Sequence, residues 1–258
     1  MKKITEKDLA NNPIKRLASC LVLDTSESMG WRMDDGSMPI DELNRGVKMY
    51  MKAIKNDEKN KEKVEIAIIT FGSKEFSKSI PEQQRDPKNG VKKILDFDDH
   101  INDEKEIPSL EADGFTSMGE AVSLALEMLD ERKKVYKRTS GTYDQPWLII
   151  MTDGYPYDYQ KKMRNYGFYD GETINESASK ATELVDNKKL VVIPIACGDD
   201  ANIDILKKFS PKNDPMRVTH LDFEKFFEYL SQTQAKPGEG FIEGATDYLS
   251  DLMNKDND

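Results

Sequence analysis

Four short apolar runs, separated by long polar and amphipathic stretches, determine the kind of fold that this chain can adopt. They span residues 17–23, 64–71, 147–151 and 190–197. Runs of this length that are rich in Val and Ile are typical of strands buried on both faces, because a strand with one wet face alternates apolar and polar residues. The sequence therefore predicts a mostly parallel sheet with helices on both of its faces.

The stretches between the runs carry the spacing expected of the covering helices. Apolar residues recur every three or four positions at Ile40, Leu43, Val47, Tyr50 and Ile54, and again over residues 118–129. Pro39 is well placed for the start of the first helix. Ser117 and Glu120 form an S-x-x-E capping box at the head of the second helix. Both segments are therefore predicted to be amphipathic helices packed on the sheet.

The remainder of the chain continues the alternation of strand and helix. Residues 174–187, 202–209 and 223–230 have helical patterns, and residues 217–221 have the pattern of a short strand. Residues 75–80 fit an antiparallel edge strand that follows the 64–71 run. This order predicts an α/β fold of the doubly wound, Rossmann-like kind, with a mostly parallel central sheet, right-handed crossovers and one antiparallel edge strand.

Composition narrows the class of partner. The 258 residues include 38 Lys and Arg against 48 Asp and Glu, giving a net charge of −10. Nucleic acid and anionic membrane are disfavoured as partners because each would need a basic surface. The longest apolar runs are too short to span a membrane and no apolar leader follows the N-terminal lysines, so we expect a cytoplasmic protein.

The supply of reactive side chains is small. Cys20 and Cys197 both lie in strand-like runs, where buried free thiols are the ordinary interpretation. With only His100 and His220 in the chain, histidine-based catalysis and a histidine-rich zinc site are poorly supported.

We expect three parts along the chain. Residues 1–15 form a polar N-terminal arm, residues 16–235 form the folded domain, and residues 236–258 form an acidic C-terminal tail that opens with Pro-Gly-Glu-Gly. The tail is either a solvated extension or a segment that docks on this domain or on a partner.

Three oxygen-bearing side chains follow the first apolar run as D-x-S-x-S: Asp24, Ser26 and Ser28. In an extended segment residues two apart face the same way, so these three can present oxygen to one point. A carboxylate and two hydroxyls suit magnesium or manganese, whereas zinc prefers sulfur and imidazole. The alternative is that an Asp- and Ser-rich loop merely caps a helix.

Two further segments supply oxygen atoms at the same predicted edge of the sheet. Asp153 follows the buried 147–151 run, and Thr116 lies in D-G-F-T just before the predicted second helix, where it could also be a simple helix cap. In open α/β sheets ligands bind at the carboxyl ends of the strands. Magnesium takes six oxygen ligands and usually keeps several waters, which leaves a position for a carboxylate from a partner.

At this point the sequence resembles a known family, the von Willebrand factor A (VWA) domain with its metal-ion-dependent adhesion site (MIDAS). The resemblance covers residues 17–230, and D-T-S-E-S-M, G-F-T-S-M-G-E-A and M-T-D-G occur in the family order. The chain is most similar to the bacterial TerY/YegL-type branch through P-I-D-E-L-N-R-G at 39–46, I-T-F-G at 69–72 and T-D-G-Y-P-Y-D at 152–158. Such proteins occur near tellurium-resistance and stress-response genes, some alongside a kinase and a phosphatase.

The resemblance implies a VWA fold and a ligand set. Ser26, Ser28 and Thr116 would be hydroxyl ligands, and Asp24 and Asp153 would bind the ion directly or through water. The ion would be Mg²⁺, with Mn²⁺ or Ca²⁺ as alternatives. The chain departs from the family pattern at Glu27, where glycine is common, and in residues 30–38, which look like an insertion.

Aromatic residues flank the predicted site. Trp31 lies in the insertion, and Tyr155 and Tyr157 belong to a tyrosine-rich stretch after Asp153. Trp and Tyr are favoured anchors in protein interfaces. We predict that Trp31, Tyr155 and Tyr157 contact a protein partner; the alternative is that they pack one long loop onto the domain.

The sequence is compatible with three alternative functions. The first is a non-enzymatic recognition module that binds an acidic side chain of a partner through the metal. The second is an accessory subunit of an ATPase of the chelatase or MoxR kind, encoded in the same gene cluster. The third is a magnesium-dependent phosphatase of the haloacid dehalogenase kind, which the sequence disfavours because Ser26 stands where that family has a second Asp. No G-x-x-x-x-G-K-[ST] phosphate-binding loop is present.

Overall fold

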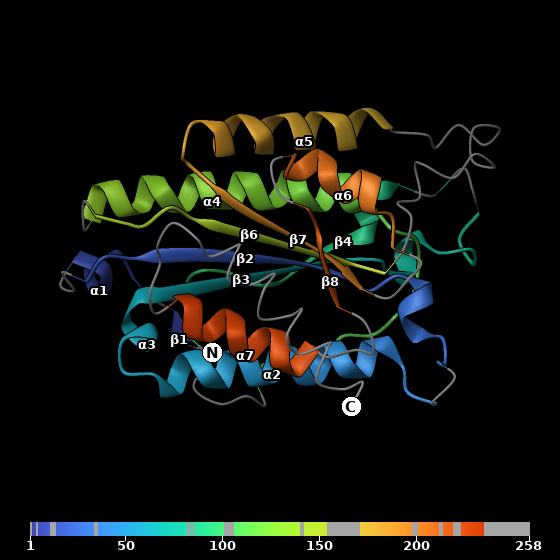
Figure 1. Cartoon of the computed structure of the whole chain (residues 1–258), viewed down its shortest axis with the longest axis horizontal. Helices are drawn as coiled ribbons and strands as arrows, with labels where there is room; N and C mark the ends of the chain where they lie inside the picture. The colour runs from blue at the N-terminus through green and yellow to red at the C-terminus, as the bar shows by residue number, and fades with distance from the viewer. Residues whose placement is uncertain are drawn as a thin grey trace.

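The computed structural model contains one six-stranded sheet with helices on both faces (Figure 1). It describes residues 2–3, 5–10, 14–33, 36–81, 84, 86–100, 106–139, 142–153, 171–197, 201–211, 214–218 and 223–234. The sheet order is β4-β3-β2-β6-β7-β8. The strands are β2 (Leu17–Asp24), β3 (Val64–Phe71), β4 (Val91–Leu95), β6 (Trp147–Thr152), β7 (Val191–Cys197) and β8 (Met216–Val218). Neighbours pair in parallel except β3 and β4, which confirms the predicted fold class.

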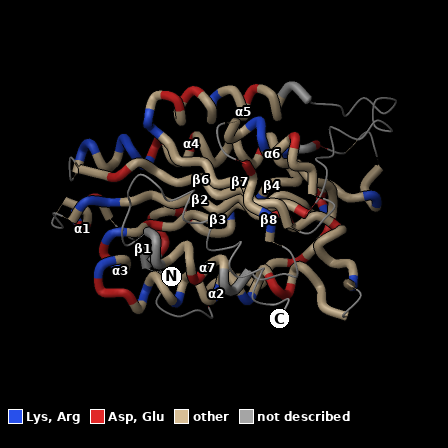
Figure 2. Tube along the Cα trace, viewed as in Figure 1, with Lys and Arg blue, Asp and Glu red and all other residues tan. Residues whose placement is uncertain are grey.

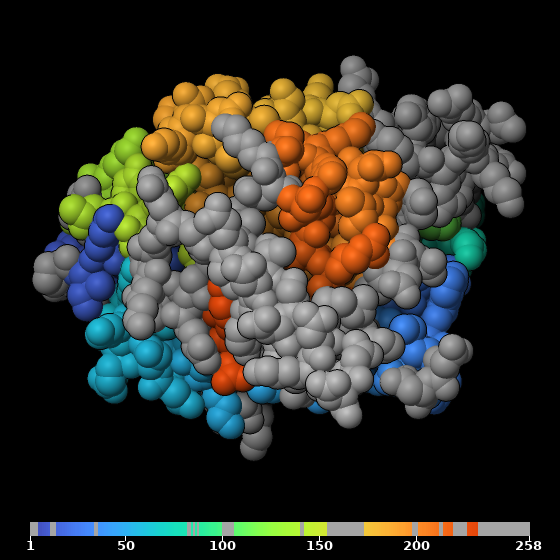
Figure 3. Space-filling model, viewed as in Figure 1, coloured from blue at the N-terminus to red at the C-terminus, as the bar shows by residue number. Residues whose placement is uncertain are grey.

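Two groups of helices cover the sheet. One face carries α2 (Pro39–Asn56), the single turn α3 (Asn60–Lys63) and α7 (Phe223–Gln234); the other carries α4 (Met118–Thr139), α5 (Gly171–Asp186) and α6 (Ile203–Phe209) (Figure 1). The space-filling view shows α5 and α6 side by side at the surface (Figure 3). None of the helices in the described residues is long and apolar enough to cross a membrane.

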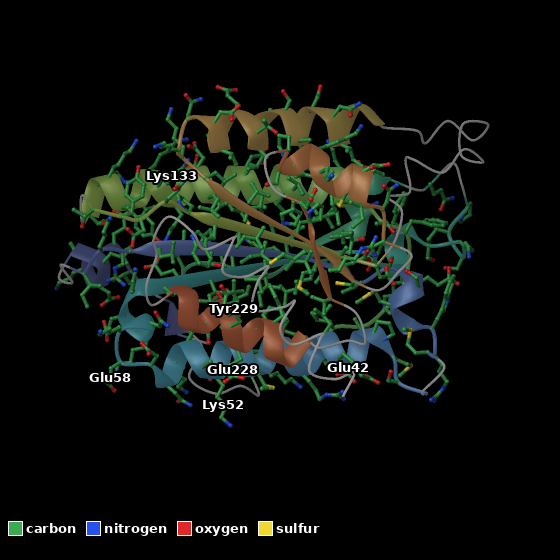
Figure 4. All side chains as sticks on the ribbon, in the orientation of Figure 1. Glu42, Lys52, Glu58, Lys133, Glu228 and Tyr229 are labelled. Atoms are coloured by element: carbon green, nitrogen blue, oxygen red, sulfur yellow. The ribbon has the colours of Figure 1, made fainter. Side chains whose placement is uncertain are left out.

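The core is divided by the sheet because successive strand residues point to opposite faces. In β2, Leu21 and Leu23 pack with α2 and α7, whereas Cys20 and Val22 pack with α4 and α5. Charged residues are concentrated on the helices and loops, and the central strands are almost free of them (Figure 2). Lys52 and Glu58, for example, point away from the sheet (Figure 4).

The antiparallel edge strand lies later in the chain than predicted. Residues 75–80 do not form a strand: they comprise the end of the 3-10 helix η2 (Lys74–Phe76) and turns, and the edge strand is β4. The reason is local hydrogen bonding. The Ser73 carbonyl accepts from Phe76 N–H and the Ser77 carbonyl accepts from Ile80 N–H, which are turn patterns that compete with a strand.

The predicted capping box at the start of α4 is not formed as expected. The Ser117 hydroxyl is buried and has no hydrogen-bond partner among the described residues. It lies against Gly90, where an added Cβ would be 2.4 Å from Ser117 Oγ. Tertiary packing at this position therefore takes precedence over the local capping motif.

The described part of the N-terminal arm packs on the domain. The strand β1 (Lys2–Lys3) pairs antiparallel with β5 (Asp99–His100), and α1 (Glu6–Ala10) lies against α4. Leu9 in α1 is only 1% exposed, and Glu6 forms a 2.8 Å ion pair with Arg138. The C-terminal tail at 236–258 lies outside the described residues, and the three-part division of the chain stays a prediction.

Candidate metal centre

Asp24 is the most buried of the predicted ligands. It ends β2 in the middle of the sheet and is 1% exposed. Its Oδ1 accepts from the Ser26 N–H at 2.8 Å, and its Oδ2 accepts from the Thr152 hydroxyl at 2.6 Å. Burial raises the pKa of the Asp24 carboxyl, whereas the hydrogen bonds from Thr152 and Ser26 lower it. No Lys or Arg of the described residues forms an ion pair with this carboxylate.

A chain of oxygen atoms links Ser26, Ser28 and Asp153. The two serine Oγ atoms are 3.1 Å apart, and the Ser28 hydroxyl donates to Asp153 Oδ1 at 3.0 Å. Asp153 follows β6, which is the neighbour of β2 in the sheet. Four of the five predicted ligands, from two segments 125 residues apart, therefore lie in one hydrogen-bonded group at the carboxyl edge of the sheet.

The backbone that brings the two serines together is not the extended segment that strand alternation predicted. Ser26 precedes the 3-10 helix η1 (Glu27–Gly30), so Ser28 lies inside a helical turn. The Glu27 side chain between them is 48% exposed and forms a 2.8 Å ion pair with Lys78. The expected convergence of the side chains is thus present, but a turn produces it.

Thr116 lies on a neighbouring loop that is attached to the first. Asp113 N–H donates to the Thr25 carbonyl at 2.9 Å, and Glu27 N–H donates to the Gly114 carbonyl at 3.0 Å. The Thr116 side chain is 8% exposed and is not hydrogen-bonded to the other four predicted ligands among the described residues. The structure therefore places the loop of Thr116 at the site without joining its hydroxyl to the bonded group.

The close approach of these loops depends on glycine. Gly114 has a φ of +75°, and an added Cβ would lie 2.0 Å from the Ser73 carbonyl oxygen. Gly72 has a φ of +104°, and its Cβ would lie 2.4 Å from Ser26 N. Only glycine combines a positive φ with the absence of a side chain, so both positions keep the loops in backbone contact.

Sequence reasoning missed two threonines that support the site. The Thr152 hydroxyl is the side-chain donor to Asp24 described above. The Thr25 hydroxyl donates to the carbonyls of Phe71 and Gly72 at 3.1 and 2.9 Å, which fixes the start of the serine loop to β3. Both residues directly adjoin a predicted ligand, and that adjacency is the only sequence signal that could have found them.

The donor set fits a hard divalent cation. Among the described residues there is no group of three or more His, Cys, Asp or Glu side chains that could hold a metal ion, so any ion here would depend on hydroxyl ligands. Two carboxylates with serine hydroxyls are hard oxygen donors. The nearby Cys197 offers no competing thiolate, because burial raises the pKa of its thiol and the charges of Asp153 and Asp24 raise it further.

Of the three residues predicted to contact a partner, Trp31 lies among the described residues. Trp31 directly follows η1, its N–H donates to the Ser28 carbonyl at 2.9 Å, and its side chain is 62% exposed. Met33, 43% exposed, follows it in the 30–38 segment. Tyr155 and Tyr157 lie outside the described residues.

Comparison with known proteins gives a family and several structures of the same fold. The family model described as "von Willebrand factor type A domain" matches residues 20–155. A search of the curated proteins found no match.

Three solved structures illustrate the similarity in fold. The vWF domain of the type V pili tip protein Mfa5 from Porphyromonas gingivalis aligns with a TM-score of 0.56 and 14% identity, over 87% of this chain and 98% of that one. The pilus adhesin SpaC from Lactobacillus rhamnosus GG aligns with a TM-score of 0.56 and 18% identity, over 94% and 32%. Proximal thread matrix protein 1 from the mussel byssus, in a form with a zinc-occupied MIDAS motif, aligns with a TM-score of 0.53 and 14% identity, over 87% and 47%. This chain thus spans less than half the length of the mussel protein and of SpaC.

Proposed function

Because the chain belongs to the von Willebrand factor type A domain family, we propose that it is a non-enzymatic module that recognises a protein partner through a bound divalent cation. Asp24, Ser26, Ser28, Thr116 and Asp153 are the proposed ligands. The observation that carries the proposal is the hydrogen-bonded chain of Ser26, Ser28 and Asp153 oxygens beside the buried Asp24 carboxylate.

Each of these residues has a distinct role in the proposal. Ser26 and Ser28 present neutral oxygens, Asp24 and Asp153 supply negative charge, and Thr116 adds a hydroxyl from the neighbouring loop. When bound, the cation supplies a coordination position for a carboxylate of the partner. The partner would approach the carboxyl edge of the sheet, where the 62% exposed Trp31 follows the serine loop.

Mg²⁺ is the proposed ion, with Mn²⁺ and Ca²⁺ as alternatives of the same hard-ligand class. The zinc-occupied MIDAS of the mussel protein supports a divalent ion at a site of this kind, and it requires that zinc be tested even though the donor set lacks sulfur and imidazole.

The first test is an ion-dependent thermal shift. An ion present at its dissociation constant adds about 0.4 kcal/mol of stability, and at ten times that concentration about 1.4 kcal/mol. Since 1 kcal/mol moves Tm by about 2 to 4 °C in a chain of this length, we expect a rise of about 1 to 5 °C in millimolar Mg²⁺ or Mn²⁺. Scanning calorimetry of the metal-free protein with and without each ion measures it.

A matched pair of variants tests the location of the ion. Asp153→Asn keeps the shape of the side chain but removes a charge from the site, so it should abolish most of the shift. Glu27→Gln removes a charge from the same edge of the sheet, at a side chain that instead pairs with Lys78, and should keep the full shift. Equal losses in both variants would mean that the ion responds only to the general acidity of this surface.

The proposed partner donates an Asp or Glu side chain to the ion and packs against Trp31, Tyr155 and Tyr157. Trp31→Ala should reduce Mg²⁺-dependent capture of partners from cytosol. Ile14→Ala is the control, because Ile14 is a 40% exposed apolar residue near the start of β2, at the opposite end of the strand. Unchanged capture by Trp31→Ala would remove Trp31 from the interface.

The biological setting that we propose is a bacterial cytoplasmic system of the tellurium-resistance or stress-response type. A kinase, a phosphatase or an ATPase of the same gene cluster is the proposed partner, and an accessory role in an ATPase complex is the main alternative. A Mg²⁺-dependent pull-down that is lost in Asp153→Ala identifies which of these binds. Mg²⁺-dependent hydrolysis of p-nitrophenyl phosphate that is lost in Asp24→Asn would instead favour the haloacid dehalogenase alternative.

A further inference from the structure

Asn44 in α2 connects that helix to the segment leading to Thr116. Its Oδ1 accepts from the Leu110 N–H at 2.7 Å, and its Nδ2 donates to the Leu110 carbonyl at 2.9 Å. The same Nδ2 donates to the Ile40 carbonyl at 2.9 Å within the helix. One side-chain amide thus satisfies both polar groups of a residue 66 positions away, and α2 orients it.

The segment that Asn44 holds has no regular structure of its own. Residues 108–113 form neither helix nor strand, while Leu110 is 7% exposed and packs in the core on the α2 side of the sheet. Backbone groups buried without a secondary-structure partner need hydrogen bonds from side chains. Asn44 supplies them at Leu110, and the backbone bonds of Asp113 and Gly114 to the serine loop fix the next turn.

Thr116 comes shortly after these two attachments in the chain. The Phe115 N–H donates to the Phe76 carbonyl at 2.9 Å, which adds a third attachment immediately before Thr116. A residue on an irregular segment loses conformational freedom when it coordinates an ion. If the segment is already fixed, the entropy cost of binding the ion is smaller. The placement of the Thr116 hydroxyl therefore depends on how firmly residues 110–115 are held.

We propose that Asn44 is a positioning residue of the metal centre: it clamps Leu110 so that Thr116 is already in place when the ion binds. The inference rests on the proposed function and deepens it, because it assigns a role in ion affinity to a residue that does not touch the ion. It also gives a physical purpose to the Asn of the P-I-D-E-L-N-R-G segment.

The test is a double-mutant cycle read as affinity for Mn²⁺ alone, measured by titration calorimetry. Asn44→Leu keeps the size of the side chain and removes all three hydrogen bonds. It should weaken Mn²⁺ binding about tenfold, the lower range for loss of a group that orients a metal ligand. In a Thr116→Ala background the same substitution should change the affinity less than about twofold, because the ligand that it positions is already absent.

Two further variants keep the result interpretable. Asn44→Asp retains the acceptor for the Leu110 N–H and loses the two donated bonds, so it should weaken Mn²⁺ binding less than Asn44→Leu does. It replaces Asn44→Leu in the test if that variant fails to fold. Gln145→Leu breaks a similar clamp, the 2.9 Å bond from Nε2 to the Leu190 carbonyl, at the other end of the sheet, and should leave Mn²⁺ affinity unchanged.

The outcomes separate the two proposals. If the wild type binds Mn²⁺ and the folded Asn44 variants bind it equally well, the positioning role is wrong and the metal site stands. The same holds if Asn44→Leu lowers the Mn²⁺ affinity by the same factor with and without Thr116. If the wild type binds neither Mn²⁺ nor Mg²⁺, the proposed function fails and the role of Asn44 fails with it.

Discussion

Replacing Glu65 with alanine should lower the free energy of unfolding by about 3 to 5 kcal/mol, because it would leave the buried Arg16 without a counter-charge and remove one of the two carboxylates that pair with the buried Arg132. Glu65 lies in β3 and is 5% exposed. Its Oε2 accepts from Arg132 Nε at 2.6 Å and from the Tyr136 hydroxyl, and its Oε1 lies 3.6 Å from Arg16 Nη1.

The cost arises from what remains after the substitution. The side chains of Arg16 and Arg132 are 7% and 4% exposed, so water cannot readily replace the lost carboxylate. Arg132 keeps its ion pair with Asp98 and its place over the Tyr136 ring, 5.3 Å from the centroid. Arg16, among the described residues, keeps only the hydrogen bond from its Nη1 to the Glu62 carbonyl. Burial and the charge of Glu65 raise the pKa of the Tyr136 hydroxyl, so it stays protonated and loses its acceptor as well.

Urea unfolding followed by circular dichroism measures the effect. Glu58→Ala is the control: the Glu58 side chain is 87% exposed, pairs with Lys61 at 2.9 Å and points into solvent (Figure 4). Its loss should change stability by less than about 1 kcal/mol. A Glu65→Ala protein within 1 kcal/mol of the wild type would contradict the assignment of this network as a buried, mutually dependent ion cluster.

The same variant separates stability from ion binding. Glu65 pairs with Ala18 near the start of β2, whereas the proposed ligands follow its end at Asp24. Distant sites without shared partners contribute additively to stability. Glu65→Ala should therefore melt at a lower temperature and still show the Mg²⁺-dependent rise.

The sheet and its covering helices were predictable because the sequence signal is strong where a strand is buried on both faces. In β2 all eight residues are buried, and the run of apolar residues reflects that directly. The edge strand β4 was not predictable. It has a register shift against β3 and exposes both Lys92 and Lys93, so its sequence shows neither the alternation of a half-buried strand nor the apolar run of a buried one.

The site was predictable where ligands adjoin strand ends and unpredictable where they depend on distant contacts. Asp24 and Asp153 end or follow buried runs, so their meeting at one edge follows from parallel pairing. Asn44 and Thr152 act on groups 66 and 128 residues away, and no local pattern encodes such a contact. Ser28 was placed at the site through an extended segment although a 3-10 turn holds it, because hydroxyl spacing alone does not distinguish the two.

Gly114→Ala should be the second strongly destabilising change, and it should act at the site itself. A non-glycine residue in the left-handed region costs about 1 to 2 kcal/mol. The new Cβ would also lie 2.0 Å from the Ser73 carbonyl oxygen and 2.6 Å from Ser73 N, and backbone atoms cannot move aside as a flexible side chain can. This overpacking costs about 1 to 3 kcal/mol in addition to the backbone cost, so Gly114→Ala should lower the free energy of unfolding by about 2 to 5 kcal/mol.

Gly36 provides a matched control for the backbone cost alone. Its φ of +84° is close to that of Gly114, but an added Cβ would meet nothing within 4 Å. Gly36→Ala should therefore cost only about 1 to 2 kcal/mol. Thermal unfolding of both variants gives the difference, which measures the contact between residues 114 and 73.

Ion affinity distinguishes a structural effect from an effect on the site. Relief of the clash in Gly114→Ala requires the 113–116 loop to move away from Ser73, and the Gly114 carbonyl that anchors Glu27 N–H moves with it. Mn²⁺ binding should then weaken in Gly114→Ala and stay at the wild-type level in Gly36→Ala. Equal affinities in the two folded variants would mean that the Thr116 loop does not contribute to the ion site, and the ligand set would reduce to Asp24, Ser26, Ser28 and Asp153.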